Sequence, residues 1–177
     1  MQLIVNDELK LQTLQQSEAA DYFGLIQANQ AQLAKWLPWA LKVETLADQE
    51  RTIRAAVKAD QNQPTQFSIY WRHQLVGRIS FVELDLRKQT AEIGYWLSED
   101  AQGNGIMCAS VDRLVQYGFE ILRLRQIDLK IAVQNKASLH VAAACGFKQQ
   151  ERLTNAIHLI YGPVDAVRWT RFNKITN

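Results

Sequence analysis

The chain has 177 residues, of which 47% are hydrophobic and 21% are charged, a composition typical of a globular protein. Its 20 basic and 18 acidic residues give a net charge of +2 without any block of Lys or Arg, which argues against a dedicated nucleic-acid-binding surface. No apolar run approaches the roughly 18–20 residues of a membrane span, and the N-terminal residues do not match a secretory signal.

The cysteine content points to a reduced compartment. Cys108 and Cys145 are the two cysteines, and neither has a second Cys or a His at metal-ligand spacing. We therefore expect a cytoplasmic protein that binds neither a metal ion nor a membrane. No linker, repeat or low-complexity segment divides the sequence, so residues 1–177 are expected to form one domain.

The N-terminal part is expected to contain a strand and two helices. The alternating stretch ELKLQTL (Glu8–Leu14) predicts the strand. Ser17 is the predicted cap of a helix that runs to about Asn29. Thr45 is the predicted cap of a second helix, which the NQP sequence (residues 62–64) would end. Between the helices lies the aromatic segment KWLPW.

From Thr65 onward the apolar residues alternate. TQFSIYW and LVGRISFVELDL predict a hairpin that turns at Arg72-His73-Gln74, and TAEIGYWLS predicts a third strand. A helix from about Asn104 to Leu122, the strand QIDLKIAV and a helix ending at Gly146 follow, before two last strands. The order β-α-α-β-β-β-α-β-α-β-β predicts an α+β or mixed α/β layered fold.

Two glycines, Gly103 and Gly105, lie between the third of these strands and the long helix. The first N–H groups of a helix have no partner within the helix and carry partial positive charge, so they bind anions well. Glycine lets the backbone approach such an anion closely. The same glycines are equally compatible with an ordinary turn. A P-loop and a dinucleotide fingerprint are both excluded by the residues that follow.

The wider sequence around this turn resembles the GNAT superfamily of N-acetyltransferases. QGNGIM (Gln102–Met107) is similar to the acyl-CoA signature Q/R-x-x-G-x-G/A at its first and fourth positions. The segments EIGYWL, VQNKAS, CGF and KWLPW further resemble the RimJ/RimL-type ribosomal-protein N-terminal acetyltransferases. The resemblance runs from about Leu9 to Phe172 and implies a central, mostly antiparallel, splayed sheet flanked by helices.

The resemblance also implies a binding site for acetyl-CoA. The amides of the turn would hold the pyrophosphate, the backbone of the preceding strand would pair with the pantetheine, and an Asn before the next helix would lie near the thiol. The residues so implied are Tyr95, Trp96, Leu97, Gln102, Gly103, Asn104, Gly105, Ile106, Met107 and Asn135. Asn104 replaces a Lys or Arg that the family commonly has, which removes one positive charge.

The catalytic groups are less constrained by the motifs. The resemblance places Ser138 beside the sulfur, to protonate the leaving thiolate, although Ser138 could instead cap its helix and Asn135 could be only a turn residue. We nominate Glu92 as the general base and Glu83 as the second candidate; either could also be a solvent-facing carboxylate. The two cysteines are interpreted as small structural thiols rather than nucleophiles.

The acceptor side departs from the family pattern. Trp36 and Trp39 would either form a wall for the acceptor or close the first helix onto the sheet. Gln150 stands where the subgroup usually has a Glu, and Asp165 lacks the His that often accompanies it.

The sequence therefore predicts an acetyl-CoA-dependent N-acetyltransferase that acts on a protein or peptide N-terminal α-amino group, by direct attack in a ternary complex. The alternatives are an enzyme for a small amine (a polyamine, an antibiotic or a metabolite) and a CoA-binding module without transfer activity. A homodimer is compatible with the subgroup.

Overall fold

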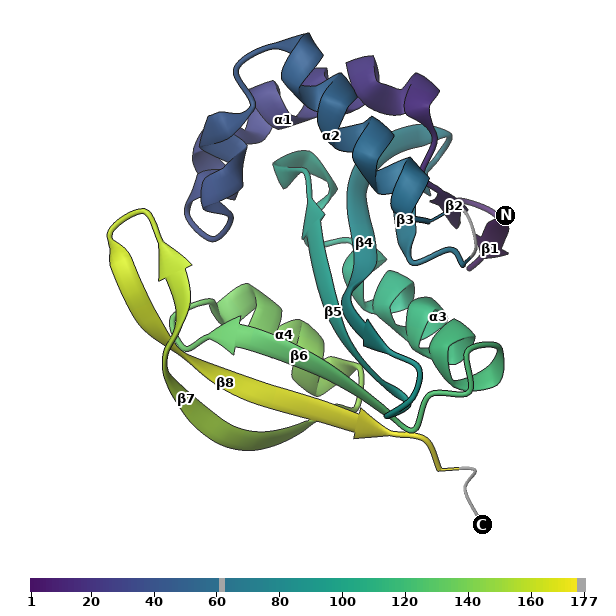
Figure 1. Cartoon of the computed structure of the whole chain (residues 1–177), viewed down its shortest axis with the longest axis vertical. Helices are drawn as coiled ribbons and strands as arrows, with labels where there is room; N and C mark the ends of the chain where they lie inside the picture. Colours follow the sequence, from purple (N-terminus) through teal and green to yellow (C-terminus); the bar gives the residue numbers. More distant parts are fainter. Residues whose placement is uncertain (61–62, 175–177) are drawn as a thin grey trace. The chain divides into compact units, whose positions relative to one another are not determined.

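The computed structural model describes residues 1–60 and 63–174, and these residues form one sheet with helices along it (Figure 1). Its strand order is β1-β2-β3-β4-β5-β6-β8-β7. The strands are β1 (Gln2–Ile4), β2 (Leu9–Thr13), β3 (Gln66–Trp71), β4 (Gln74–Asp85), β5 (Thr90–Leu97), β6 (Gln126–Ala132), β7 (Lys148–Leu159) and β8 (Gly162–Phe172). The helices are α1 (Ala19–Ala34), α2 (Leu46–Ala59), α3 (Ile106–Glu120) and α4 (Lys136–Ala144), with the 3₁₀ turns η1 (Gln16–Glu18), η2 (Pro38–Lys42) and η3 (Glu99–Ala101). The predicted α+β class is confirmed.

The chain packs as two compact units. The first unit contains Met1–Ile79 and Tyr95–Ile106, and the second contains Ser80–Gly94 and the chain from Met107 onward. Strands β4 and β5 each run from one unit into the other, so both units share the backbone of these two strands. A single domain for the whole chain stays a prediction.

In the first unit, α1 and α2 lie side by side and cover a buried apolar cluster (Figure 1). The cluster includes Tyr22, Ile26, Ile53 and Trp96. Helix α1 runs to Ala34, five residues beyond the predicted end, and its last residues Leu33 and Ala34 are buried. Burial of that last turn explains the extension, because apolar contacts stabilise a helix beyond its local propensity.

The predicted cap at Ser17 is wrong. The chain forms η1 there, and Glu18 precedes α1 as its N-cap residue. The Glu18 carboxylate accepts the backbone N–H of Gln15 at 2.7 Å, the Ser68 hydroxyl at 2.9 Å and the Tyr70 hydroxyl at 2.6 Å. Ser68 and Tyr70 of β3 hold Glu18 in a buried position, and α1 begins directly after it.

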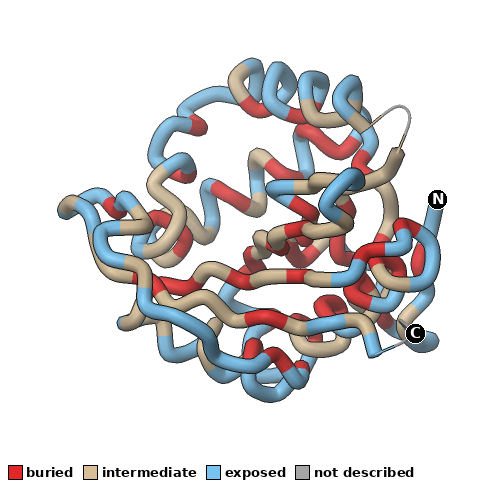
Figure 2. The backbone as a smooth tube through the Cα atoms, turned by 60° about the horizontal axis from the view of Figure 1, so that its bottom comes forward, coloured by how far each residue is buried: buried red, intermediate tan, exposed pale blue. Residues whose placement is uncertain are grey.

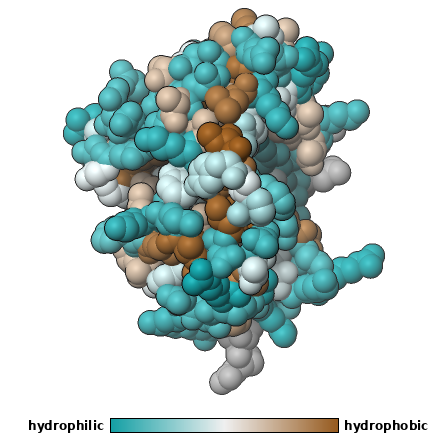
Figure 3. Space-filling view, turned by 90° about the vertical axis from the view of Figure 1, so that its left-hand side faces the viewer, coloured by the Kyte–Doolittle hydropathy of each residue, from teal (hydrophilic) through white to brown (hydrophobic). Residues whose placement is uncertain are grey.

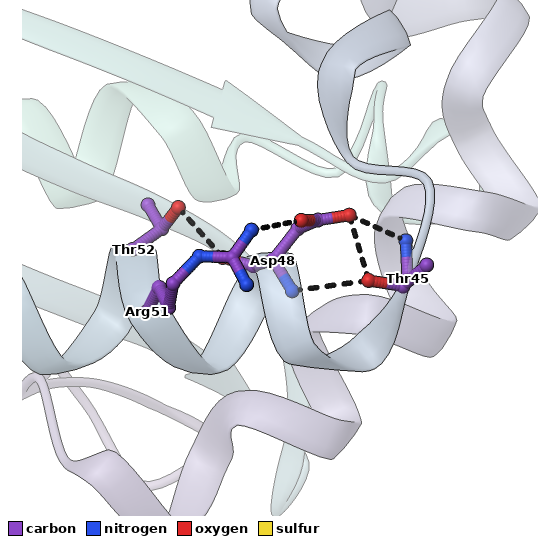
Figure 4. Close-up of polar contacts among 4 residues, drawn as sticks. All are labelled: Thr45, Asp48, Arg51 and Thr52. Carbon is purple, nitrogen blue, oxygen red and sulfur yellow. Dashed lines mark hydrogen bonds and ion pairs between the residues drawn. The ribbon is translucent and has the colours of Figure 1, made fainter.

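The predicted cap at Thr45 is confirmed (Figure 4). The Thr45 hydroxyl accepts from the Asp48 backbone N–H at 3.2 Å, and the Asp48 carboxylate accepts from the Thr45 backbone N–H at 2.9 Å. Arg51 pairs with the same carboxylate, and the Thr52 hydroxyl donates to the Asp48 carbonyl. Helix α2 ends at Ala59; of the residues predicted to end it, Asn62 lies outside the described residues.

The hairpin of β3 and β4 turns at Arg72 and His73, as predicted. Both residues have positive φ, 50° and 66°, which suits the tight turns that join antiparallel strands. Strand β2 pairs with β3 and also with the short N-terminal strand β1, which the sequence did not predict.

In the second unit, buried and half-buried residues alternate along β6, and an alternation of red and tan is visible along strands in Figure 2. Ile127, Leu129 and Ile131 of β6 are buried, and Gly146 ends the segment after α4 with a φ of +72°. Strand β6 pairs antiparallel with β8 and parallel with β5, where Thr90–Glu92 lie opposite Gln126–Asp128. The polar residues of these strands therefore share the opposite face.

Within the described residues, no helix is both long and apolar enough to cross a membrane.

Candidate active site

The glycine turn between β5 and α3 is open. Gly103 and Gly105 have φ of +77° and +73°, in the left-handed region that favours glycine. A Cβ added to either residue would meet no atom within 4 Å. Helix α3 begins directly afterwards at Ile106, two residues later than predicted, because the glycines interrupt helical geometry. An accessible turn at a helix N-terminus fits a phosphate group in shape and in charge.

Side-chain amides stabilise this turn from within. The Asn104 Nδ2 group donates to the carbonyls of Ala101 at 3.3 Å and Gln102 at 3.0 Å. The Gln102 Nε2 group donates to the Leu97 carbonyl at 3.4 Å. The side chain that replaces the expected cation at position 104 therefore orders the backbone of the turn.

At the end of β5, the Trp96 side chain points into the apolar cluster of the first unit. Its ring lies 5.9 Å from the ring of Tyr22 and 6.2 Å from that of Trp39, measured between centroids. Trp96 and Leu97 are buried. Any contribution of these residues to cofactor binding therefore comes from their backbone, as the resemblance implies, and this role stays a prediction.

The aromatic segment KWLPW (residues 35–39), which runs into η2, packs against the apolar cluster of the first unit. Leu37 lies against the apolar cluster and Ala40 is buried. Trp36 is partly buried and Trp39 is 39% exposed. On the face shown in Figure 3, apolar residues (brown) lie among hydrophilic ones (teal). Of the two predicted acceptor-side residues, Trp39 has the more exposed side chain.

In the second unit, Asn135 is the N-cap of α4. Its Oδ1 atom accepts from the backbone N–H of Ser138 at 3.2 Å. Ser138 is therefore not the cap, and its hydroxyl makes no hydrogen bond to any other residue that the structure describes. Ser138 is half-buried, and its role as the acid stays a prediction.

Glu92 is paired with a cation. Its carboxylate lies 3.3 Å from the Lys130 ammonium nitrogen, and the two side chains are 20% and 30% exposed. Burial raises the pKa of Glu92 above its usual range, Lys130 opposes part of that rise, and the nearby Glu83 and Asp128 carboxylates add to it. A carboxylate with a raised pKa is a better general base than an ordinary one.

Both predicted bases line one pocket of about 570 Å³ in the second unit. The charged side chains around it are Glu83, Asp85, Lys88, Glu92, Asp128 and Arg168. Asp128 is held by the Thr170 hydroxyl at 2.5 Å. Sequence reasoning missed Lys130, Asp128 and Arg168, although the polar positions of the predicted strand QIDLKIAV already place Asp128 and Lys130 on one face.

The carboxylates near the positions that depart from the family pattern have partners in the structure. Asp165 pairs with Arg152 at 2.8 Å and accepts from the Asn155 backbone N–H at 2.9 Å. Glu151, beside Gln150, pairs with Arg168 at 2.9 Å. Each of these carboxylates thus has a structural partner.

The two cysteines lie together. The Cys145 thiol donates to the Cys108 carbonyl at 3.5 Å, and burial raises the pKa of Cys145. Among residues 1–60 and 63–174, no group of three or more His, Cys, Asp and Glu side chains is placed to hold a metal ion.

Comparison with known proteins identifies the family of the chain. Residues 8–148 match the model of the acetyltransferase (GNAT) domain family. The chain belongs to the GNAT acetyltransferases and is an acetyl-CoA-dependent N-acetyltransferase.

Three individual acetyltransferases are similar to this chain in sequence or in structure. The chain is 31% identical over 159 residues to the ribosomal-protein-serine acetyltransferase of Escherichia coli K12, which covers 86% of this chain and 89% of the relative. The microcin C7 self-immunity acetyltransferase MccE, solved with acetyl-CoA and AMP, has a TM-score of 0.90, 28% identity, and coverage of 96% of this chain and 94% of that one. RimL, the ribosomal L7/L12 α-N-protein acetyltransferase solved with coenzyme A, has a TM-score of 0.95 at 24% identity, covering 99% of this chain and 100% of that one, and supports the fold. The predicted GNAT fold and the RimL-type resemblance are confirmed.

Proposed function

We propose that this enzyme transfers acetyl from acetyl-CoA to the N-terminal α-amino group of a protein or peptide. The observation that carries the proposal is the open turn of Gly103 and Gly105 at the start of α3. The 31% identity to a ribosomal-protein-serine acetyltransferase over most of both chains supports the choice of acceptor.

In this proposal the amides of Gln102–Met107 bind the pyrophosphate of acetyl-CoA. The backbone of Tyr95–Leu97 pairs with the pantetheine, and Asn135 lies near the thiol. The acetyl group reaches the amine by direct attack in a ternary complex. The amine attacks the thioester carbonyl and gives up its proton to a base, and the carbon–sulfur bond breaks. The thiolate takes a proton from the Ser138 hydroxyl, which regains one from water.

An α-amino group suits such a site because its reference pKa is about 7.7–8.0, so a modest base suffices to deprotonate it. Glu92 is the proposed base, since burial raises its pKa toward the range in which a carboxylate accepts protons. Trp39 is the proposed acceptor contact in the first unit, with Trp36 beside it. A cytoplasmic location and a possible homodimer belong to the same proposal.

A small cationic amine, such as a polyamine, is the second candidate acceptor. The pocket that contains Glu83 and Glu92 is lined by four carboxylates and two cationic side chains, so its charge favours an ammonium group. A polyamine and an N-terminal peptide are therefore to be compared directly as substrates.

The first test is calorimetric titration with acetyl-CoA. Gly105→Glu places a carboxylate and a side chain in the turn, and we expect it to abolish binding. Gly146→Glu is the matched control, because Gly146 has nearly the same φ, +72°, and the same open surroundings. The site is supported if the wild type and the Gly146 variant bind acetyl-CoA and the Gly105 variant does not. Equal loss of binding in both variants, or no binding by the wild type, would overturn it. Initial rates with N-terminal peptides and polyamines then separate the two acceptors.

A further inference from the structure

Asn29, in the second half of α1, uses both ends of its side-chain amide. Its Oδ1 atom accepts from the backbone N–H of Glu99, the first residue of η3, at 2.8 Å. Its Nδ2 group donates to the Leu25 carbonyl one helical turn earlier, also at 2.8 Å. The bond to Leu25 fixes the orientation of the amide, so its oxygen is directed at one peptide group of the segment that follows β5.

Hydrogen bonds continue from Glu99 to the glycine turn. The Gln102 backbone N–H donates to the Glu99 carbonyl at 3.0 Å. The Asn104 side chain in turn donates to the Gln102 carbonyl at 3.0 Å. Three successive contacts therefore connect α1 with Asn104, the residue between Gly103 and Gly105, and all of them lie within the first unit.

The glycines make such support necessary. Glycine has more accessible backbone conformations than any other residue, so ordering it costs the most entropy. No atom lies within 4 Å of a Cβ position at Gly103 or Gly105, so side-chain packing does not define this conformation. The hydrogen bonds made by Gln102 and Asn104 define the conformation of the turn instead. A binding turn that is ordered beforehand gains affinity because the ligand no longer has to order it.

We propose that Asn29 is a positioning residue for the acetyl-CoA turn. By holding the Glu99 peptide, it keeps the turn in the conformation that receives the pyrophosphate. This inference rests on the proposed function, since it takes the turn to be the acetyl-CoA site. Asn29 touches neither the cosubstrate nor the reacting atoms in this scheme.

Gln30 provides a matched control on the same helix. Its Nε2 group donates to the Ala40 carbonyl of η2 at 3.1 Å, so it makes the same kind of bond to a different segment. Gln27 binds the Val43 carbonyl in the same way at 2.6 Å. A Gln30→Ala variant removes one amide contact of α1 without touching the path from Asn29 to the turn.

The test compares wild type, Asn29→Ala, Asn29→Asp and Gln30→Ala by calorimetric titration with acetyl-CoA and by steady-state kinetics. We expect Asn29→Ala to weaken acetyl-CoA binding about three- to tenfold, the effect of losing one hydrogen bond, and to raise the KM for acetyl-CoA in parallel. The kcat at saturation should not change. Asn29→Asp retains an oxygen for the Glu99 N–H but loses the donor to the Leu25 carbonyl, so it should recover part of the lost affinity at an ionic strength that screens its added charge.

Gln30→Ala should keep the wild-type affinity for acetyl-CoA. Wild-type affinity in Asn29→Ala, an equal loss in Gln30→Ala, or no recovery in Asn29→Asp would overturn the role of Asn29. Absence of acetyl-CoA binding by the wild type would instead overturn the proposed function, before any variant is compared, so the two failures are distinguishable.

Discussion

Glu92 and Lys130 form a half-buried ion pair, with the carboxylate 3.3 Å from the ammonium nitrogen. The pair joins β5 to β6 on the polar face of the sheet, beside Asp128, which lies opposite Glu92 in the register. Burial raises the pKa of the Glu92 carboxyl, and Lys130 lowers it again in part. The cation therefore lowers the pH at which the proposed base becomes ionised.

A base must be ionised to accept a proton, so activity should fall as the pH drops through the raised pKa of Glu92. Lys130→Met removes the charge that lowers this pKa and should move the acid limb of kcat/KM to higher pH. Glu83→Gln removes a charge that raises it and should move the limb to lower pH. Glu92→Gln should lower kcat by about 10²–10⁴-fold and leave only the acid limb that comes from ionisation of the amine substrate. Rate profiles between pH 4 and 9 decide this, and loss of the limb in Glu83→Gln alone would make Glu83 the base.

Ser138→Ala should lower kcat by about 10²–10⁴-fold, the usual contribution of a positioned acid, while acetyl-CoA affinity stays within twofold. The backbone N–H of residue 138 remains, so the cap from Asn135 is kept and the melting temperature should not change. Single-turnover rates and titration of the same samples provide the measurement. Unchanged turnover would remove Ser138 from the mechanism, and a fall in melting temperature would indicate a structural role instead.

The parts of the fold that follow local rules were predictable from the sequence. Thr45, Gly146 and the turn at Arg72-His73 were identified from capping and turn preferences, which depend on a few neighbouring residues. Strand β1 was not, because its three residues carry no periodic signal and are held by pairing with β2. The cap at Ser17 failed for a related reason: Glu18 is fixed by Ser68 and Tyr70, about fifty residues away.

In the candidate site, too, some residues were predictable from a local motif and others were not. The glycine turn and the residues around Asn135 were found because a motif with fixed spacing marks them. The contact of Lys130 with Glu92 depends on the pairing of β5 with β6, two strands that are separated in the sequence by α3. The contact of Asn29 with Glu99 spans seventy residues. Neither contact has a sequence pattern of its own, since both arise from packing.

Two glycines with opposite surroundings test the packing of the first unit. A Cβ at Gly77 would lie 2.3 Å from the Trp96 carbonyl oxygen, a backbone atom that cannot turn away, whereas nothing lies within 4 Å of a Cβ at Gly24 in α1. We expect Gly77→Ala to destabilise the fold by about 3 kcal/mol or more and Gly24→Ala to stabilise it by about 0.5–1 kcal/mol. Urea unfolding of both variants measures the two effects. An equal sign for both changes would contradict the close approach of β4 to the end of β5.

The capping box at the start of α2 permits a prediction with its own control. Thr45→Ala removes the hydroxyl that accepts from the Asp48 N–H and should cost about 1 kcal/mol, or roughly 2–4 °C in melting temperature for a chain of this size. Thr52→Ala removes a hydroxyl that donates to a carbonyl within the same helix, where Ala has the higher helix propensity, so its stability should be unchanged or slightly greater (Figure 4). Thermal melts followed by circular dichroism provide the comparison. Equal destabilisation by the two changes would mean that a hydroxyl anywhere on this helix contributes as much as the cap, and the start of α2 would then be set by its packing against α1.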